Sequence, residues 1–265
     1  MIPGALTGKR VLVARAAGQA ESSAGILRER GAEPVVLPAI EVGPPDDPAP
    51  LERAVRDLSR YDWVVLTSAN GVASLIAAIE RARGAGKAAE ALARLRVAVV
   101  GSATAKRLKD LGVTAALVAK EFRGEALAHD LHAVLPRGSS PRVLLVRAQE
   151  APDALPQGLI EAGTSLDVVA AYKTRPSAEG TREIALRLRG GTLDAVIFSS
   201  GSTVDSVCDA LGASAKDLLG DVVVACIGPV TAAAATSRGI RVDVTPHIST
   251  FLSAVDALED HLRGI

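Results

Sequence analysis

Cysteine is scarce in this chain: only Cys208 and Cys226 occur in 265 residues. The two form no Cys-x-x-Cys pair and have no metal-ligand spacing. Both lie in apolar stretches, where a free cysteine behaves as a small hydrophobic residue. We therefore interpret them as core residues, which fits a cytoplasmic protein.

The chain has neither an excess of one charge nor a long apolar run. Lys and Arg (30) balance Asp and Glu (30), so the formal net charge is zero. This balance argues against a nucleic-acid partner bound through phosphate neutralisation. No apolar run approaches the roughly 20 residues of a membrane span, and the N-terminal segment has no apolar core followed by a cleavage site. We expect no membrane association and a cytoplasmic location.

Several catalytic and nucleotide motifs are also absent. No Gly-x-Gly-x-x-Gly follows the first predicted strand and no Gly-x-x-x-x-Gly-Lys-Ser/Thr occurs, which argues against NAD and ATP. A Ser-centred nucleophile elbow is missing too. His129 and His132 would share a helix face, but no spacing completes a metal site, so a solvated face is favoured. His247 is either a general acid or base or, more simply, a loop histidine near a helix cap.

What the chain does contain is an internal repeat. The matching segments are 10–16 with 142–148, 62–70 with 194–202, and 97–104 with 224–231. A period this long is not that of a solenoid, whose units run roughly 20–50 residues. A duplicated α/β unit suggests two similar lobes with a ligand site between them.

Short apolar segments alternate with helical stretches along both copies. The predicted strands lie at 10–14, 62–67, 96–100, 142–146, 194–198 and 222–227, and their continuous Val, Ile and Leu content is typical of buried parallel strands. The predicted helices lie at 21–30, 71–81, 104–111, 155–162, 203–211 and 231–238. We expect helix ends at Gly31, Gly112, Gly163, Gly212 and Gly239. This alternation predicts mainly parallel sheets flanked by helices.

Two proline-containing segments depart from the alternation. Residues 35–42 and their counterparts at 168–176 combine an apolar stretch with extension enforced by proline. They are either ordinary strands or the places where the chain crosses between lobes. The charged stretch 81–94 is interpreted as a surface helix and loop without an assigned function.

Four strand-to-helix turns are rich in Gly and small hydroxyl residues: 67–71, 101–104, 199–203 and 228–231. Such turns cap helices with a side-chain oxygen. They also leave N–H groups open at the positive end of the helix dipole, where anions bind. Ligands usually lie at the carboxyl ends of strands in open α/β sheets. The turns therefore predict either capping alone or an anion-binding cleft.

The ordered set of motifs resembles the uroporphyrinogen-III synthase family over nearly the whole chain. The segments that carry the resemblance are 11–15, 62–72, 99–105, 172–174, 198–202 and 227–232. The resemblance implies two α/β lobes that hinge about a two-stranded linker, with substrate in the cleft between them. One lobe would comprise 1–36 and 175–265, the other 41–169, and the linker strands would be 37–40 and 170–174.

The resemblance also implies a reaction. Linear hydroxymethylbilane loses its hydroxyl as water, ring D inverts through a spiro intermediate, and the ring closes as uroporphyrinogen III without a metal or organic cofactor. Helix N-termini would supply donors to the eight substrate carboxylates without a large positive charge. Because the electron-rich pyrrole ejects its own leaving group, the enzyme would act mainly by positioning. A missing catalytic triad is then expected.

Residue roles follow the same resemblance. Tyr172, where the first copy has Ile40, matches the family's linker tyrosine and would donate a hydrogen bond to the departing hydroxyl; alternatively, it only packs on the linker. Val230 replaces a threonine that some relatives carry, which leaves Thr231 alone. The expected substrate-binding residues are Arg15, Ser68, Ala69, Asn70, Gly101, Ser102, Thr104, Arg147, Ser199, Ser200, Gly201, Gly228 and Thr231.

A second function class fits the duplicated cleft equally well, namely a non-catalytic two-lobed module that binds or senses a polyanionic small molecule. For the cyclase, the expected partner is hydroxymethylbilane, with no nucleic acid and no membrane. We expect a monomer that makes transient contact with the preceding pathway enzyme.

Overall fold

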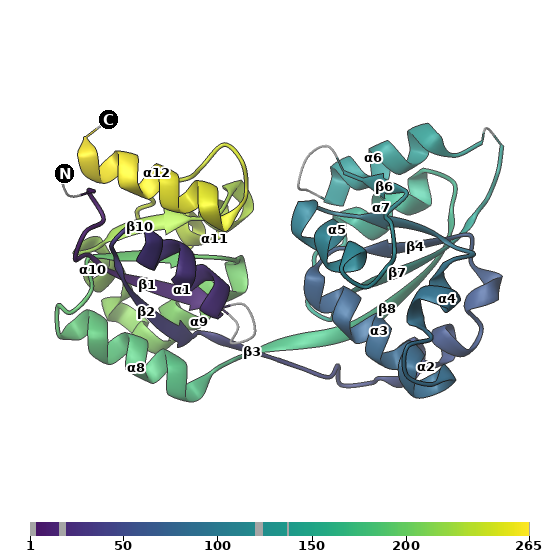
Figure 1. Cartoon of the computed structure of the whole chain (residues 1–265), viewed down its shortest axis with the longest axis horizontal. Coiled ribbons are helices and arrows are strands. Elements are labelled where there is room, and N and C mark those ends of the chain that lie inside the picture. The colour runs from purple at the N-terminus through teal and green to yellow at the C-terminus, as the bar shows by residue number, and fades with distance from the viewer. Residues whose placement is uncertain (1–3, 16–19, 120–123, 137, 265) are drawn as a thin grey trace. The chain divides into compact units, whose positions relative to one another are not determined.

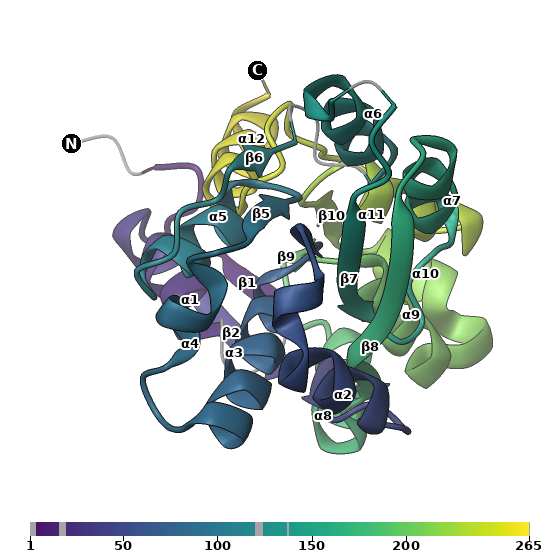
Figure 2. The ribbon, with the colours of Figure 1, turned by 90° about the vertical axis from the view of Figure 1, so that its right-hand side faces the viewer.

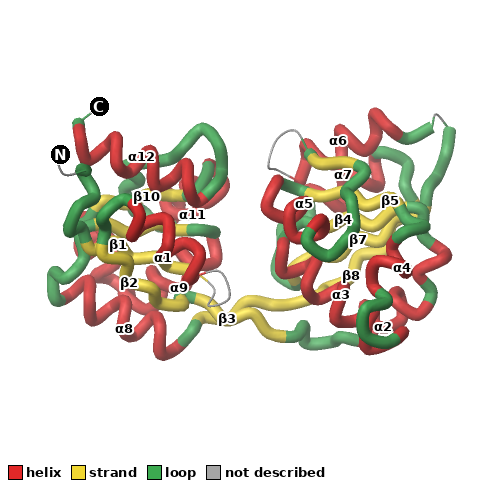
Figure 3. The backbone as a smooth tube through the Cα atoms, in the orientation of Figure 1, coloured by secondary structure: helices red, strands yellow, loops and turns green. Residues whose placement is uncertain are grey.

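The chain folds into two compact units. The computed structural model describes residues 4–15, 20–119, 124–136 and 138–264 (Figure 1). Unit 1 comprises Met1–Glu41 and Thr174–Ile265, and unit 2 comprises Val42–Lys173. The unit boundaries fall inside two strands, β3 (Ile40–Gly43) and β8 (Ser165–Pro176), which are neighbours in one sheet (Figure 3). The chain therefore passes between the units within these two strands.

Unit 1 contains a four-stranded sheet in the order β10-β9-β1-β2, and all of its pairings are parallel. Its strands are β1 (Arg10–Arg15), β2 (Glu33–Pro38), β9 (Ala195–Phe198) and β10 (Val223–Cys226). Its helices are α1 (Ala20–Glu29), α8 (Ala178–Arg189), α9 (Gly201–Leu211), α10 (Ala215–Gly220), α11 (Pro229–Ser237) and α12 (Phe251–Arg263), and a 3-10 turn, η3, spans Gly212–Ser214.

The unit 1 sheet is covered on both faces, which explains its uninterrupted apolar strands. Leu12 and Phe198 pack with α8, α9 and α10 on one face. Val13 and Ile197 pack with α1 and α12 on the other face. Adjacent residues of a strand point to opposite faces, so β1, β9 and β10 each contribute to both clusters.

Unit 2 has a six-stranded sheet in the order β3-β8-β7-β4-β5-β6. The pairings from β8 to β6 are parallel. Besides β3 and β8, its strands are β4 (Trp63–Leu66), β5 (Arg96–Val99), β6 (Leu117–Val118) and β7 (Arg142–Ala148). Its helices are α2 (Ala49–Arg56), the 3-10 turn η2 (Leu58–Arg60), α3 (Ala69–Arg83), α4 (Ala88–Leu92), α5 (Ser102–Lys109), α6 (Gly124–Val134) and α7 (Ala154–Glu161).

The unit 2 sheet is also sandwiched between helices. Leu66 and Val146 lie in a core cluster with α2 and α3. Val65 and Leu145 lie in a second cluster with α6 and α7, which pack side by side (Figure 2). Within the described residues, no helix is long and apolar enough to cross a membrane.

Each unit combines parts of both sequence repeats. In unit 2, β4 of the first copy pairs with β7 of the second, and Asp62 N donates to the Arg142 carbonyl at 2.9 Å. In unit 1, β1 of the first copy pairs with β9 of the second, and Asp194 N donates to the Arg10 carbonyl at 2.9 Å. The strand order β2-β1-β9-β10 in unit 1 therefore corresponds to β8-β7-β4-β5 in unit 2. Each of these sheets takes strands from both copies of the repeat.

The expected class of α/β protein with parallel sheets flanked by helices is confirmed. The five glycines expected at helix ends all have φ between 59° and 82°, the left-handed region that favours glycine. The extended stretch 35–42 is divided between β2 and β3 at Ala39. β2 ends at Pro38, and the carbonyl of the next residue, Ala39, accepts a hydrogen bond from Ser177 N at 3.1 Å.

Candidate active site

The first site element is the turn at the carboxyl end of β4. Ser68 has extended backbone angles and is the N-cap of α3, because its Oγ accepts a hydrogen bond from Gly71 N at 3.0 Å. Ala69 and Asn70 form the first turn of that helix. Ser68 thus does what a small hydroxyl residue is expected to do at this position.

Ser68 also contacts the expected catalytic tyrosine. The hydroxyls of Ser68 and Tyr172 lie 2.9 Å apart, and either can donate. Tyr172 is only 7% exposed. Burial raises the pKa of Tyr172 above its ordinary value, an effect that the Ser68 hydrogen bond opposes and the nearby Glu150 charge reinforces. The phenol is therefore protonated at neutral pH and can serve as a hydrogen-bond donor.

A β-bulge sets the direction of the Tyr172 side chain. In the pairing of β7 with β8, Arg147 lies opposite Ala170 but Ala148 lies opposite Tyr172, so Ala171 is an extra residue. A bulge changes which face the following side chain meets. As a result, Tyr172 joins Ala171 in the core cluster on the α3 side of the sheet, the side from which Ser68 approaches.

The second turn of unit 2 follows β5. Gly101 is the N-cap of α5 and has φ of 83°, which disfavours any other residue there. No side chain of the described residues caps this helix end, so its first N–H groups are open to an anion. Ser102 is exposed, whereas Thr104 is buried.

In unit 1, the turn after β9 is tightly closed by its own side chains. Ser200 Oγ accepts from Thr203 N at 3.3 Å, and Thr203 Oγ1 accepts from Ser200 N at 3.2 Å, which forms a capping box. Ser199 Oγ donates to the Ala14 carbonyl at 3.2 Å. A Cβ on Gly201 would lie 3.2 Å from the Cβ of Ala234, so this glycine allows α9 and α11 to pack closely.

The turn after β10 is shaped by the loop that precedes α12. A Cβ on Gly228 would lie 2.3 Å from Ser249 Oγ, so a larger residue there would require the Ser249 side chain to move. Gly228 is the N-cap of α11, and within the described part of the chain no side chain caps this end. Thr231 is buried, whereas Val230 is 62% exposed.

Of the two expected arginines, Arg147 is already paired within the chain. It is 6% exposed, and its Nη1 donates to Asp153 Oδ1 at 3.1 Å. Arg15 ends β1, but its side chain lies outside the described residues. Carboxylate binding by either arginine stays a prediction.

In the described part of the chain, the histidines do not assemble a metal centre. His129 and His132 lie on α6 and line a cavity of about 480 Å³ together with Glu161 of α7. Among the residues that the structure describes, no group of three or more His, Cys, Asp or Glu is placed to hold a metal. His247 is exposed in the loop before α12.

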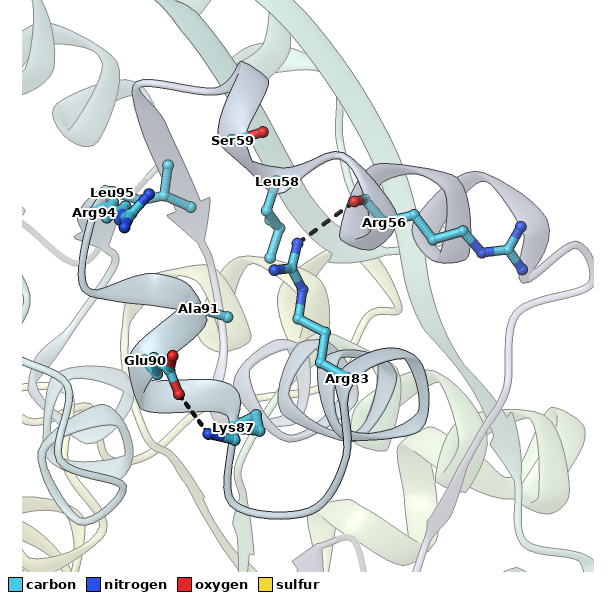
Figure 4. Close-up of a pocket in the computed structure, with 9 residues that line it drawn as sticks. All are labelled: Arg56, Leu58, Ser59, Arg83, Lys87, Glu90, Ala91, Arg94 and Leu95. Carbon is cyan, nitrogen blue, oxygen red and sulfur yellow. Dashed lines mark hydrogen bonds and ion pairs between the residues drawn. The ribbon is translucent and has the colours of Figure 1, made fainter.

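A larger cavity of about 580 Å³ lies between η2, the end of α3 and α4 (Figure 4). Two of its cationic side chains already have structural partners. Arg83 Nη2 donates to the Val55 carbonyl at 3.1 Å at the C-terminus of α2, and Lys87 Nζ lies 2.8 Å from Glu90. The residues that line this cavity come before β4 or β5 in the chain. The cavity therefore lies near the amino ends of these strands, whereas Ser68 follows the carboxyl end of β4.

The fold and the site together define an α/β protein of two parallel-sheet units, in which the hydroxyl of a buried tyrosine contacts a helix-capping serine. A crystal structure of mutant uroporphyrinogen III synthase from the extremely thermophilic bacterium Thermus thermophilus has the same fold, with a TM-score of 0.66 and 21% identity over 97% of this chain and 100% of that chain. The corresponding Helicobacter pylori structure gives 0.57 and 17%, covering 94% of this chain and 97% of that chain.

The chain belongs to the uroporphyrinogen-III synthase family, whose model, uroporphyrinogen-III synthase HemD, matches residues 21–256. The uroporphyrinogen-III synthase of Synechococcus elongatus is 30% identical over 263 residues, which cover 97% of each chain. A porphyrin biosynthesis protein HemD from Ruminiclostridium josui is 32% identical over 96% of this chain, which spans only 48% of that protein.

Proposed function

We propose that this family member converts hydroxymethylbilane to uroporphyrinogen III with inversion of ring D and loss of water. The observation that carries the proposal is the contact of 2.9 Å between the Tyr172 and Ser68 hydroxyls at the carboxyl end of β4. Support also comes from full-length similarity to a protein named uroporphyrinogen-III synthase.

In this proposal, Tyr172 assists departure of the substrate hydroxyl. The C–O bond breaks as the pyrrole nitrogen supplies its electron pair, and the phenol passes its proton along the hydrogen bond to the departing oxygen, which leaves as water. The N–H proton released from the now cationic pyrrole restores the proton to the phenolate. Burial raises the pKa of Tyr172, so the phenol remains a donor over the neutral pH range. Ser68 holds the phenol in place while its Oγ caps α3.

The substrate carboxylates would bind at the helix N-termini. The open N–H groups at Gly101 and Gly228 are the best placed, because α5 and α11 have no side-chain cap from the described residues. At Ser68 and Ser200 the caps already occupy one first-turn N–H group each. The other proposed contacts are Arg15, Ala69, Asn70, Ser102, Thr104, Arg147, Ser199, Gly201 and Thr231.

The proposal extends to organisation and location. We expect residues 37–40 and 170–174 to act as linker strands between a lobe of 1–36 with 175–265 and a lobe of 41–169. The unit boundaries inside β3 and β8 support this division. We also propose a cytoplasmic monomer that needs no metal or organic cofactor and contacts the preceding pathway enzyme transiently.

The deciding experiment supplies purified protein with hydroxymethylbilane and identifies the uroporphyrinogen isomer. Formation of the type III isomer above the spontaneous background is expected. If only the symmetrical type I isomer forms, the proposed activity is wrong. Tight binding of the tetrapyrrole without turnover would instead favour the binding module.

A further inference from the structure

We propose that Asp46 is a positioning residue for Tyr172. Asp46 binds the side chain of Gln149, whose main-chain N–H donates to the Tyr172 carbonyl, and the side chain of Lys173, the residue that follows Tyr172, so that the contacts form a closed ring. The inference rests on the proposed function, because it is the reaction that gives the direction of the Tyr172 hydroxyl its importance.

The first contact of the ring fixes the Tyr172 carbonyl. Gln149 N donates a hydrogen bond to this carbonyl at 2.9 Å. The contact comes directly after the extra residue Ala171, where the regular pairing of β7 with β8 is interrupted. Because a bulge disrupts the ladder locally, the direction of Tyr172 depends more on this bond than it would in a regular strand.

The second contact joins Gln149 to Asp46. Asp46 N donates to Gln149 Oε1 at 2.8 Å, and Gln149 Nε2 donates to Asp46 Oδ2 at 2.7 Å. The amide side chain thus has both of its polar ends satisfied by a single residue. A reciprocal pair of this kind fixes position and orientation together.

The third contact closes the ring at Lys173. Lys173 Nζ forms an ion pair with Asp46 Oδ1. Lys173 is only 8% exposed, and a buried ammonium needs a charged or polar partner to offset its lost hydration. Asp46 therefore binds the residue that follows Tyr172 as well as the residue that binds the Tyr172 carbonyl.

The segment that presents Asp46 is stiff. Pro44 and Pro45 precede it, and each fixes its own φ near about −65°. Pro45 is buried. This leaves Asp46 little freedom to follow Tyr172 if the strand shifts, so the ring resists a change in the direction of the phenol.

The proposal can be tested with tyrosine as its own reporter, because the chain has only two tyrosines, Tyr61 and Tyr172. Protein labelled with 3-fluorotyrosine gives two fluorine resonances, which Tyr61→Phe assigns. In Asp46→Ala we expect the fluorine chemical shift of Tyr172 to move toward that of a solvent-exposed tyrosine. We also expect the titration midpoint of the Tyr172 hydroxyl to fall. The Tyr61 resonance is expected to stay, since Tyr61 donates to Asp167 at 2.7 Å outside the ring.

Kinetics supply the second readout. Loss of positioning is expected to lower kcat by up to about 100-fold with little change in KM, and to raise the share of type I product. Asp46→Asn keeps hydrogen bonding to Gln149 but loses the charge opposite Lys173, so its effect should be intermediate. It also replaces the alanine variant should that variant fail to fold. The matched control is Asp110→Ala, which removes an exposed ion pair with Lys106 in the same unit.

Unchanged Tyr172 resonance and unchanged kcat in both Asp46 variants would overturn the proposal. A wild-type protein that forms no uroporphyrinogen III would instead overturn the proposed function. The two failures are distinguishable, because the fluorine measurement on Asp46→Ala needs no substrate.

Discussion

Asp194 accepts three hydrogen bonds from Arg10, from the main-chain N–H at 2.8 Å, from Nε at 3.0 Å and from Nη2 at 3.5 Å. The contact joins β1 of the first repeat to the chain just before β9 of the second. Asp62 holds the equivalent place in unit 2, where it accepts from Arg142 N at 2.8 Å. An aspartate at the equivalent position of each unit, Asp194 in unit 1 and Asp62 in unit 2, thus joins the two repeats.

This contact predicts a pH-dependent contribution to stability. The hydrogen bond from Arg10 holds the pKa of Asp194 below its ordinary value near 3.8. A lowered carboxyl pKa stabilises the fold above the unfolded-state pKa, and this stability is lost as pH falls through the folded-state pKa. Asp194→Asn should therefore have a lower urea midpoint than wild type at pH 7, and the difference should shrink below about pH 4. Asp221→Asn, at an exposed position, is the control, and a pH-independent difference would contradict the linkage.

Tyr172→Phe removes the proposed hydroxyl donor but keeps the aromatic ring of the side chain. We expect the mutant to keep measurable type III production at a rate reduced by at most about 10²–10⁴-fold, the range for loss of a general acid. The rate is measured with hydroxymethylbilane, and the isomers are separated. Unchanged activity would reduce Tyr172 to a packing residue.

The repeat provides a matched pair for the capping serines. Ser68→Ala and Ser200→Ala each remove an N-cap that binds a first-turn N–H, so each should lower the free energy of unfolding by about 0.5–2 kcal/mol. Of the two serines, it is Ser68 that contacts Tyr172. The Tyr172 fluorine resonance should therefore shift in Ser68→Ala and stay in Ser200→Ala. A shift in both variants would mean that general loosening, rather than the hydroxyl contact, affects Tyr172.

Two helical glycines should respond oppositely to alanine. A Cβ on Gly180 would lie 1.8 Å from the Pro38 carbonyl oxygen, so Gly180→Ala forces α8 away from β2 and should destabilise by about 1–3 kcal/mol. Apart from the adjacent residues and the backbone of α1 itself, no heavy atom of the described residues lies within 4 Å of a Cβ on Gly25, so Gly25→Ala should stabilise by about 0.4–1 kcal/mol. Urea denaturation of both variants measures the difference, and an equal response would contradict the close approach at Pro38.

The two thiols should be inert in the native protein. Burial raises the pKa of Cys226 to about 12 and also raises the pKa of Cys208. Since the thiolate is the reactive form, a disulfide reagent at a pH of about 8 should label no thiol before unfolding and both thiols afterwards. Rapid labelling of the native protein would show that one of them is accessible.

Features set by neighbouring residues could be predicted from the sequence. The apolar segments around Val64 and Val196 became buried strands, because continuous apolar composition is a local property. The helix end at Gly163 could be predicted from the glycine itself, which adopts a φ of 82° in the structure. No helix was predicted over Ala49–Arg56, where the structure has α2, although a proline in the first turn is typical of a helix start.

The arrangement around Tyr172 was largely beyond sequence reasoning. The resemblance suggested Tyr172, but the extra residue Ala171 is visible only when β7 and β8 are paired. The pairing of Asp46 with Gln149 joins residues 103 positions apart, and no local sequence pattern predicts it. Arg147 was expected to meet a carboxylate, and the carboxylate it meets in the structure belongs to Asp153 of the same chain.

The division of the repeats between the units has a consequence for the order of events during synthesis. Unit 2 is one continuous segment, Val42–Lys173, so all of its strands have been made before the C-terminal part of the chain exists. In contrast, β1 has only β2 beside it until β9 has been translated. Domains generally fold as units during translation, so the N-terminal strands should remain exposed to chaperones while the middle of the chain is already folded.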